Sequence, residues 1–434
     1  MSVINDGKKY MSFWMMVALV SGNMIGSGIF LLPSSLASIG SISILSWIFT
    51  SIGALLLALV FSNMSKLVPN VDGGPYTYVR IGLGKYMGFQ SGFGYWLSLW
   101  VGNCAISLAA VGYLGYFFPI LSSNQYITTL SAIAVIWVLT LFNLLGPRKV
   151  GWLQLLSFIA KIAPLVLLII GGWFFINPHN YLEFNRTNHG YISAFSSASS
   201  LTLWAFIGLE SAAVAATKVK NPEKTVPRAT IIGTSIAAFI YIGTSVVIMG
   251  MIPSGVLEKS TAPFALAASE MIGQSGGVLI AITAVIACIG TLNGWIMLTS
   301  VVAKSISETR LFPNIFAHEN KFGAANYSLI LSACLMTLLL LFTVTPDLVE
   351  QFNLIILMAV LAALIPYFYT TMSNILITRK RKSYNIRKVL VISILAWLYS
   401  LWTIIGSGAD VVYYGMILLF FGSSIYLLAE YKNL

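Results

Sequence analysis

The sequence predicts an all-α integral membrane protein with about twelve transmembrane helices. Hydrophobic residues make up 58% of its 434 residues, charged residues make up only 9%, and the mean hydropathy is +0.88. This composition lies far outside the range of soluble globular proteins. The apolar residues also form runs of about 20 residues or more, the length at which a helix crosses a bilayer. We therefore expect one polytopic membrane domain over residues 1–434.

Short connections separate the expected spans. The first apolar run is too long for a signal peptide and has no convincing cleavage site, so it is expected to remain as a span. The expected spans are Met11–Ala37, Ile42–Ser65, Met87–Leu121, Tyr126–Leu145, Trp152–Ile176, Ile192–Ala216, Ala229–Ile252, Gly277–Ala303, Tyr327–Val344, Gln351–Ile377, Val389–Ile405 and Val411–Ala429.

Lysine and arginine residues orient this stack of helices. Of the 24 in the chain, 21 lie in alternate loops or in the terminal segments, whereas only Arg186 and Lys259 lie in the opposite loops and Lys161 lies within a span. By the positive-inside rule, both termini are cytoplasmic and the number of spans is even. The net charge of +11 is therefore an orientation signal rather than a nucleic-acid footprint.

The first span is interrupted by the stretch SGNMIGSGIF, which begins at Ser21. A helix in lipid keeps its backbone N–H groups bonded internally, so a run that unwinds at Gly26, Ser27 and Gly28 uses the freed groups for another partner. Successive N–H groups at Ser27, Gly28 and Ile29 can cup an anionic oxygen at the positive end of a helix dipole. A free amino-acid carboxylate fits this cup, and close helix packing through small residues is the alternative.

The sixth span has a second interruption, because it reads SLTLWAFIGLESAAVAA with Gly208 and Glu210 at its centre. The first span starts inside and the sixth starts outside, so the two interruptions occupy corresponding positions in halves of opposite topology. This arrangement is typical of secondary transporters. The signatures of ion channels, nucleotide-driven pumps and intramembrane enzymes are absent from the sequence. We expect repeats over residues 11–176 and 192–377, followed by extra helices over 389–429.

Three side chains within the expected spans stand out as functional candidates. Glu210 is the one carboxylate near the middle of a span, where an ion costs at least about 2.5 kcal/mol. It would bind an ammonium group, carry a proton or hold a gate, and a structural hydrogen bond to freed backbone is the alternative. Trp204 and Trp295 each offer an aromatic face to a cation or an aliphatic stem, with interfacial anchoring as their alternative.

Short motifs spread from end to end of the chain carry a resemblance to a known family. They are SGNMIGSGIFLLP from Ser21, YW at Tyr95 followed by GN at Gly102, TLWAFIGLESA from Thr202, VKNPEKTVP from Val219, MGMIP from Met249, GW at Gly294, LFPNIFA from Leu311 and IPYFYT from Ile365. The chain resembles the basic amino acid/polyamine antiporters of the amino acid, polyamine and organocation transporter superfamily, most closely the arginine/agmatine exchangers among them. The resemblance implies a leucine-transporter-like fold of ten core helices plus two. It also implies a homodimer in the bacterial inner membrane that needs no cofactor, ATP or bound metal.

The resemblance also implies roles for individual residues. Ser27 with Asn23 and Gly28 would hold the substrate carboxylate, and Ile207 with neighbouring carbonyl groups would hold the α-amino group. Trp204 would stack on the substrate stem, while Asn103 and Trp295 would meet its distal cationic group. The full set of implied binding residues is Asn23, Gly26, Ser27, Gly28, Ser98, Asn103, Trp204, Ile207, Trp295 and Ala359. The implied gating or proton-sensing residues are Tyr95, Lys161, Glu210 and Tyr367.

The chain departs from the arginine/agmatine exchangers around the distal pocket. Ser98, Leu99 and Ile106 stand where those exchangers have alanine, cysteine and methionine, and Ala359 replaces a serine. These residues look like the putrescine/ornithine branch. Lys161 is a second departure, which resembles the lysine that takes the place of a sodium ion in proton-coupled amino acid transporters of the superfamily. A lysine that snorkels to the cytoplasmic end of its span is the alternative.

Two classes of function therefore remain open. The first is an electrogenic exchanger that takes in a basic amino acid and expels its decarboxylated amine. The second is a proton-coupled amino acid symporter in which Lys161 or Glu210 carries the proton. A substrate sensor, or a partner subunit that does not transport, is a third and weaker reading.

Overall fold

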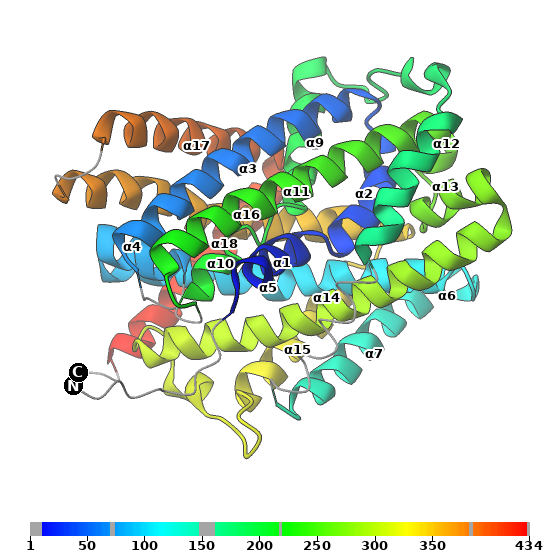
Figure 1. Cartoon of the computed structure of the whole chain (residues 1–434). Helices are drawn as coiled ribbons and strands as arrows, with labels where there is room; N and C mark the ends of the chain where they lie inside the picture. Colours follow the sequence, from blue (N-terminus) through cyan, green and yellow to red (C-terminus); the bar gives the residue numbers. More distant parts are fainter. Residues whose placement is uncertain (1–10, 70–73, 147–160, 217–218, 382–384, 432–434) are drawn as a thin grey trace.

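The computed structural model describes residues 11–69, 74–146, 161–216, 219–381 and 385–431, without the side chains of Ser27 and of residues 428–431. Within these ranges the α- and 3-10 helices make up all of the regular structure (Figure 1). Nine helices in the described part of the chain are long and apolar enough to cross a membrane. The prediction of an all-α membrane protein is confirmed.

The long helices follow the expected spans closely. The described spans are the broken helix α1 (Phe13–Met24) and α2 (Ser27–Ala37), then α3 (Ile42–Leu67), α5 (Lys85–Leu114), α7 (Gln125–Asn143), α11 (Pro222–Met251), α14 (Gln274–Glu308), α16 (Leu348–Lys380), α17 (Ile386–Gly406) and α18 (Ala409–Tyr431). The other expected spans correspond to shorter helices, which are Lys161–Phe175, α9 (Tyr191–Trp204) with α10 (Ser211–Val214), and α15 (Asn326–Phe342). The beginning of the expected span Trp152–Ile176 lies outside the described residues.

Several short helices in the connections were not predicted, because they are too short to carry a periodic apolar pattern. They are α4 (Pro75–Leu83), α12 (Ser254–Leu257), α13 (Pro263–Ile272), and the 3-10 helices η2 (Pro178–Tyr181) and η4 (Asn314–Ala317). Helix α6 (Ile120–Ser123) and the 3-10 helix η1 (Trp173–Phe175) overlap the ends of the expected spans Met87–Leu121 and Trp152–Ile176. The predicted end of the third span at Leu121 is wrong. Helix α5 ends at Leu114, and turns lead through Pro119 into α6.

The first predicted interruption is present, although it begins earlier than expected. Ser12 caps α1 by accepting a hydrogen bond from the Met15 N–H, and α1 ends at Met24. Ile25 and Gly26 form the break, so Ser27 and Gly28 already belong to the first turn of α2. A Cβ atom on Gly26 would lie 2.5 Å from Cγ2 of Thr291, which explains why glycine is needed at the break.

The second interruption separates α9 from α10. Residues 205–210 form turns, and Gly208 has a φ of +112°, a conformation that side chains with a Cβ rarely adopt. Leaving the helix frees backbone carbonyl groups, and the Tyr241 hydroxyl on α11 donates to one of them, the Ala205 oxygen, at 2.8 Å. The two interruptions therefore both lie inside the bundle, as the sequence predicts.

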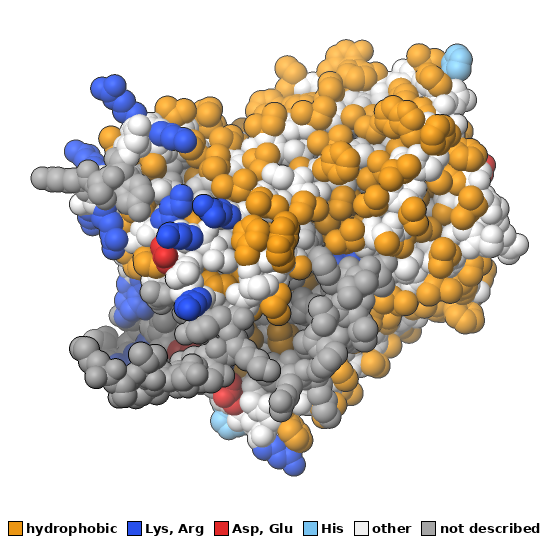
Figure 2. Space-filling model, viewed as in Figure 1, with side chains coloured by type: hydrophobic (Ala, Val, Ile, Leu, Met, Phe, Trp, Pro, Cys, Tyr) orange, Lys and Arg blue, Asp and Glu red, His pale blue; other side chains and the backbone are white. Residues whose placement is uncertain are grey.

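The two ends of the bundle differ in charge. Helix α5 is buried along nearly its whole length and packs between α14 and α16. Lysine and arginine side chains gather at one end of the molecule (Figure 2). We refer to this end as the basic face; it includes the end of α3 with Lys66, the beginning of α5 with Lys85, the end of α16 with Arg379 and Lys380, and the beginning of α17 with Arg387. Helices α12 and α13 and the connection that contains η2 lie at the opposite end (Figure 1).

Candidate functional site

A small cavity lies where the two helix breaks meet. Its volume is about 20 Å³. Six of the predicted binding residues line it: Asn23, Gly26, Gly28, Trp204, Ile207 and Trp295. Met24, Ile106 and Thr291 complete the lining. The sequence did not single out Thr291, although its position one helical turn before Trp295 places both on one face of α14.

One end of the cavity is formed by the first turn of α2. The N–H groups of a first helical turn have no partner within their own helix, and they lie at the positive end of its dipole. Gly28 belongs to this turn and lines the cavity. Beside it, Asn23 donates a hydrogen bond from Nδ2 to the Ser211 hydroxyl at 2.8 Å, which ties α1 to α10. The Ser27 side chain, which is predicted to contact the substrate carboxylate, is not among the side chains that the structure describes.

The Trp204 ring packs between two glycines. A Cβ atom on Gly28 would lie 2.9 Å from Nε1 of Trp204, and a Cβ atom on Gly102 of α5 would lie 2.5 Å from the far edge of the same ring. The indole is only 7% exposed, and its N–H is buried without a hydrogen-bond partner in the described structure. Trp204 is therefore not an interfacial anchor. Gly102 belongs to one of the motifs that carry the family resemblance, but this packing role was not predicted for it.

Asn103 and Trp295 are the two residues that the resemblance assigns to the distal cationic group. Asn103 is fully buried and donates from Nδ2 to the Thr299 hydroxyl at 3.2 Å, while its Oδ1 has no partner among the described residues. Trp295 is 6% exposed, so it too is a core residue rather than an anchor. Three predicted binding residues, Asn103, Ser98 and Ala359, are not part of the cavity lining. The Ser98 hydroxyl donates to the Tyr95 carbonyl of its own helix at 2.8 Å.

Glu210 joins three helices at the second break. Its carboxylate accepts hydrogen bonds from the hydroxyl groups of Tyr95 on α5, at 2.8 Å, and Tyr367 on α16, at 2.5 Å. The Gly208 N–H also donates to it at 3.2 Å. All three side chains are fully buried. The predicted network of Tyr95, Glu210 and Tyr367 is thus brought together beside the break, and the carboxylate also serves freed backbone, which was its alternative role.

Lys161 does not snorkel toward an end of its span, so that alternative is wrong. The side chain is 3% exposed, and its Nζ donates to the Gly22 carbonyl of α1 at 2.6 Å and to the Thr291 hydroxyl of α14 at 3.5 Å. A buried ammonium group is costly unless it is hydrogen-bonded. These contacts place Lys161 directly behind the first break, next to a residue that lines the cavity.

The site is covered on one side and hollow on the other. Away from the basic face, the Tyr113 hydroxyl of α5 donates to the Phe30 carbonyl of α2 at 2.8 Å and accepts from the Phe264 N–H of α13 at 3.3 Å. Toward the basic face lies a cavity of about 390 Å³, which we term the vestibule. It shares Asn23 and Trp295 with the small cavity. Asn23 and Trp295 therefore lie between the small cavity and the vestibule.

The small cavity, at about 20 Å³, has room for about one water molecule in this conformation, but the groups around it are those that a short linear molecule needs. Backbone N–H groups at the first turn of α2 suit an anionic group, and the indole faces of Trp204 and Trp295 suit a methylene stem or a cation. The buried Oδ1 of Asn103, which has no partner among the described residues, is a hydrogen-bond acceptor outside the cavity lining. An amino acid with a cationic side chain matches each of these features.

We expect replacement of either Trp204 or Trp295 by Leu to weaken binding of a basic amino acid by roughly 1 to 2 kcal/mol, the size of a desolvated cation–π contact. Replacement by Phe should weaken it less, because a smaller aromatic face remains. Isothermal titration of the purified variants measures both effects. Equal losses for Leu and Phe would indicate that only shape matters, and unchanged dissociation constants would exclude direct contact.

The chain is similar over most of its length to known proteins. The family model described as "Amino acid permease" matches residues 11–426. The "Putrescine transporter PotE" of Escherichia coli (strain K12) is 36% identical over 408 residues, which are 93% of this chain and 92% of the relative. The "Cadaverine/lysine antiporter" of the same strain is 35% identical over 399 residues, 90% of this chain and 88% of the relative. A "Putrescine transporter PotE" of Haemophilus influenzae is 36% identical over 414 residues, 94% of each chain.

Proposed function

Because the chain belongs to the amino acid permease family, we propose that it is a secondary transporter that exchanges a basic amino acid for the amine formed by its decarboxylation. The amino acid is arginine, ornithine or lysine, and the amine is agmatine, putrescine or cadaverine. The relatives are transporters rather than enzymes, and their names cover putrescine, cadaverine and lysine. Those names support amino acid and polyamine substrates for this chain.

The observation that carries the proposal is the slot between the two helix breaks. An amino acid and its decarboxylated amine share the methylene stem and the distal cation, so both would use Trp204 and Trp295 of the cavity lining and the Oδ1 of Asn103, which has no partner in the described part of the chain. Only the amino acid has a carboxylate for the first turn of α2. Loss of the carboxylate leaves the amine with one more positive charge, so one-for-one exchange moves charge across the membrane and is electrogenic.

The distribution of charge supports a topology for this transporter. The basic face lies in the cytoplasm together with both termini, by the positive-inside rule, and the vestibule opens toward that side. We assign the protein to the bacterial inner membrane. Its two repeats span residues 11–176 and 192–377. The apolar outer faces of α17 and α18, which include Ile405, Phe420 and Phe421, are exposed and contact lipid or a second copy in a homodimer.

One observation favours a second candidate, a proton-coupled amino acid symporter. Lys161 is buried against Gly22 of the broken helix and Thr291 of the cavity wall. Gain or loss of a proton at Nζ would change the number of hydrogens that it donates to these groups. A proton binding there could therefore alter the first break directly.

The two candidates differ in what they need inside a vesicle. An exchanger takes up labelled amino acid only when amine or amino acid is present inside, whereas a symporter fills amine-free vesicles under a pH gradient alone. We expect proteoliposomes loaded with amine to take up labelled arginine, ornithine or lysine, and amine-free vesicles to remain near background. Uptake driven only by the pH gradient would overturn the exchanger.

Lys161→Ala is expected to leave amine-driven exchange largely intact, because in an exchanger no proton has to pass through this residue. In a symporter the same variant would abolish uptake driven by a pH gradient and spare exchange. Both assays are run on the same protein preparation, with the thermal midpoint of unfolding as the control for lost packing. Loss of exchange with an unchanged midpoint would contradict the expectation.

A further inference from the structure

The vestibule ends in a pair of charges on α14 that the binding site does not use. Lys304 and Glu308 both line the vestibule, near the end of α14 at the basic face. At its inner end the vestibule reaches Trp295, whose indole N–H is buried without a partner among the described residues. Trp295 and Glu308 are 13 positions apart on α14, which is about 20 Å at the helical rise of about 1.5 Å per residue. Glu308 is thus a separate feature from the cavity at the helix breaks.

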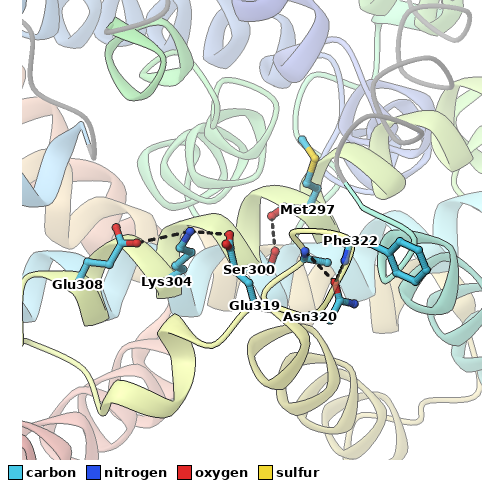
Figure 3. A network of polar contacts seen from close by, with 8 residues as sticks. Met297, Ser300, Lys304, Glu308, Glu319, Asn320 and Phe322 are labelled. Carbon is cyan, nitrogen blue, oxygen red and sulfur yellow. Dashed lines mark hydrogen bonds and ion pairs between the residues drawn. The ribbon is translucent and has the colours of Figure 1, made fainter.

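Lys304 lies between two carboxylates (Figure 3). Its Nζ is 2.5 Å from Oε1 of Glu319, in the connection after α14, and 3.5 Å from Oε1 of Glu308. Glu319 does not line the vestibule. Glu308 is the more open of the two, with 55% of its side chain exposed against 43% for Glu319. Glu319 therefore holds Lys304 closely, and Glu308 keeps capacity for another cation.

The end of α14 that carries Glu308 lies at the basic face, where lysine and arginine side chains gather (Figure 2). Their positive potential lowers the local concentration of a cationic amine. Of the described residues that line the vestibule, Glu308 is the one carboxylate. The negative charge of Glu308 attracts a cationic amine to the vestibule, whereas the surrounding lysine and arginine side chains repel it.

We propose that Glu308 captures an ammonium group of the substrate that arrives from the vestibule side, and that Lys304 competes with the substrate for this carboxylate. This inference rests on the proposed transport of cationic substrates. Lys304 carries the same chemical group as the end of a diamine, so both bind the carboxylate in the same way. Glu319 reduces the competition by holding Lys304 aside.

The test is transport by protein reconstituted in a single known orientation, with the KM measured separately from each face for the amine that the wild-type protein carries. Glu308→Gln should raise the KM from the vestibule side by about two- to fivefold, the effect of losing an exposed ion pair, with kcat unchanged. The KM from the opposite face should stay the same, which also shows that the variant is folded. Glu308→Asp keeps the charge and should remain close to wild type.

Variants of the two neighbours test the competition. Lys304→Gln should lower the KM from the vestibule side, because the competing cation is gone. Glu319→Gln should raise this KM, because Lys304 is free to pair with Glu308. The double variant Lys304→Gln/Glu319→Gln should return to the value of Lys304→Gln.

Three outcomes would overturn the inference. They are an unchanged KM in Glu308→Gln, equal shifts from both faces, and shifts of the same sign in Glu308→Gln and Lys304→Gln. Each of these is measured with a protein that still exchanges cations, so the proposed function survives them. If the wild-type protein carries only uncharged amino acids, the proposed function fails first, and this inference fails with it.

Discussion

Gly28→Val is expected to abolish binding of the amino acid while the protein still inserts and folds. Gly28 belongs to the first turn of α2, where unpaired N–H groups are available to the carboxylate. A Cβ atom at this position would already lie 2.9 Å from Nε1 of Trp204, so the branched side chain of valine must displace the indole or fill the slot. Loss of two hydrogen bonds to a charged group costs roughly 3 to 6 kcal/mol, which corresponds to at least a hundredfold loss of affinity.

The exchange partner serves as the internal control for Gly28→Val. The amine has no carboxylate, so its affinity should fall less than that of the amino acid. Gly190→Val is a matched substitution, also at the beginning of a helix, because the space around a Cβ atom on Gly190 is empty and its φ of −64° is one that valine adopts. Titration of both ligands to purified Gly28→Val checks the result. Undiminished amino-acid affinity would show that α2 does not hold the carboxylate.

Glu210→Gln is expected to reduce exchange by about tenfold or more and to flatten its dependence on pH. The carboxylate has two oxygens that accept from Tyr95 and Tyr367, whereas the amide has one acceptor oxygen, so one hydroxyl loses its partner. A hydrogen bond to a charged group contributes about 1.5 to 3 kcal/mol, which sets the size of the effect. The glutamine amide also cannot take up or release a proton at the pH values at which exchange is measured. Initial exchange rates measured over a pH series test both parts.

Tyr95→Phe and Tyr367→Phe separate the two parts of the Glu210 effect. Each removes one hydrogen bond and keeps the carboxylate. We therefore expect slower exchange with a pH dependence that resembles the wild type. If Glu210→Gln keeps the full pH dependence, the proton is sensed at another group, and Lys161 becomes the leading candidate.

The broad fold could be predicted because lipid imposes strong rules on sequence. Each signal has one main physical cause in a membrane. Long apolar runs match the thickness of the bilayer, lysine and arginine collect in the loops on one side, and glycine-rich interruptions free backbone groups for a partner. The exact break could not be predicted in the same way. The sequence placed it at Gly26–Gly28, but Gly26 is needed for its contact with Thr291, which is 265 positions away. Short helices such as α13 carry too few residues to show a pattern.

The candidate site was predicted in part. Trp204, Trp295 and Glu210 could be found because aromatic and charged residues deep in a span need a reason to be there. The burial of the Lys161 side chain could not be predicted, because its contacts with Gly22 and Thr291 depend on how three helices pack together. The sequence also could not predict that the Ser98 hydroxyl donates to the Tyr95 carbonyl of its own helix.

The central claim is that one site serves both the amino acid and the amine. Competition binding tests it most directly: purified protein is saturated with labelled arginine, ornithine or lysine, and the matching unlabelled amine is titrated in. We expect complete displacement, with a dissociation constant for the amino acid that rises in proportion to amine concentration and a constant number of sites. Trp295→Leu should weaken both ligands. Simultaneous binding of the two ligands, or an amine that binds without displacing the amino acid, would contradict a shared site.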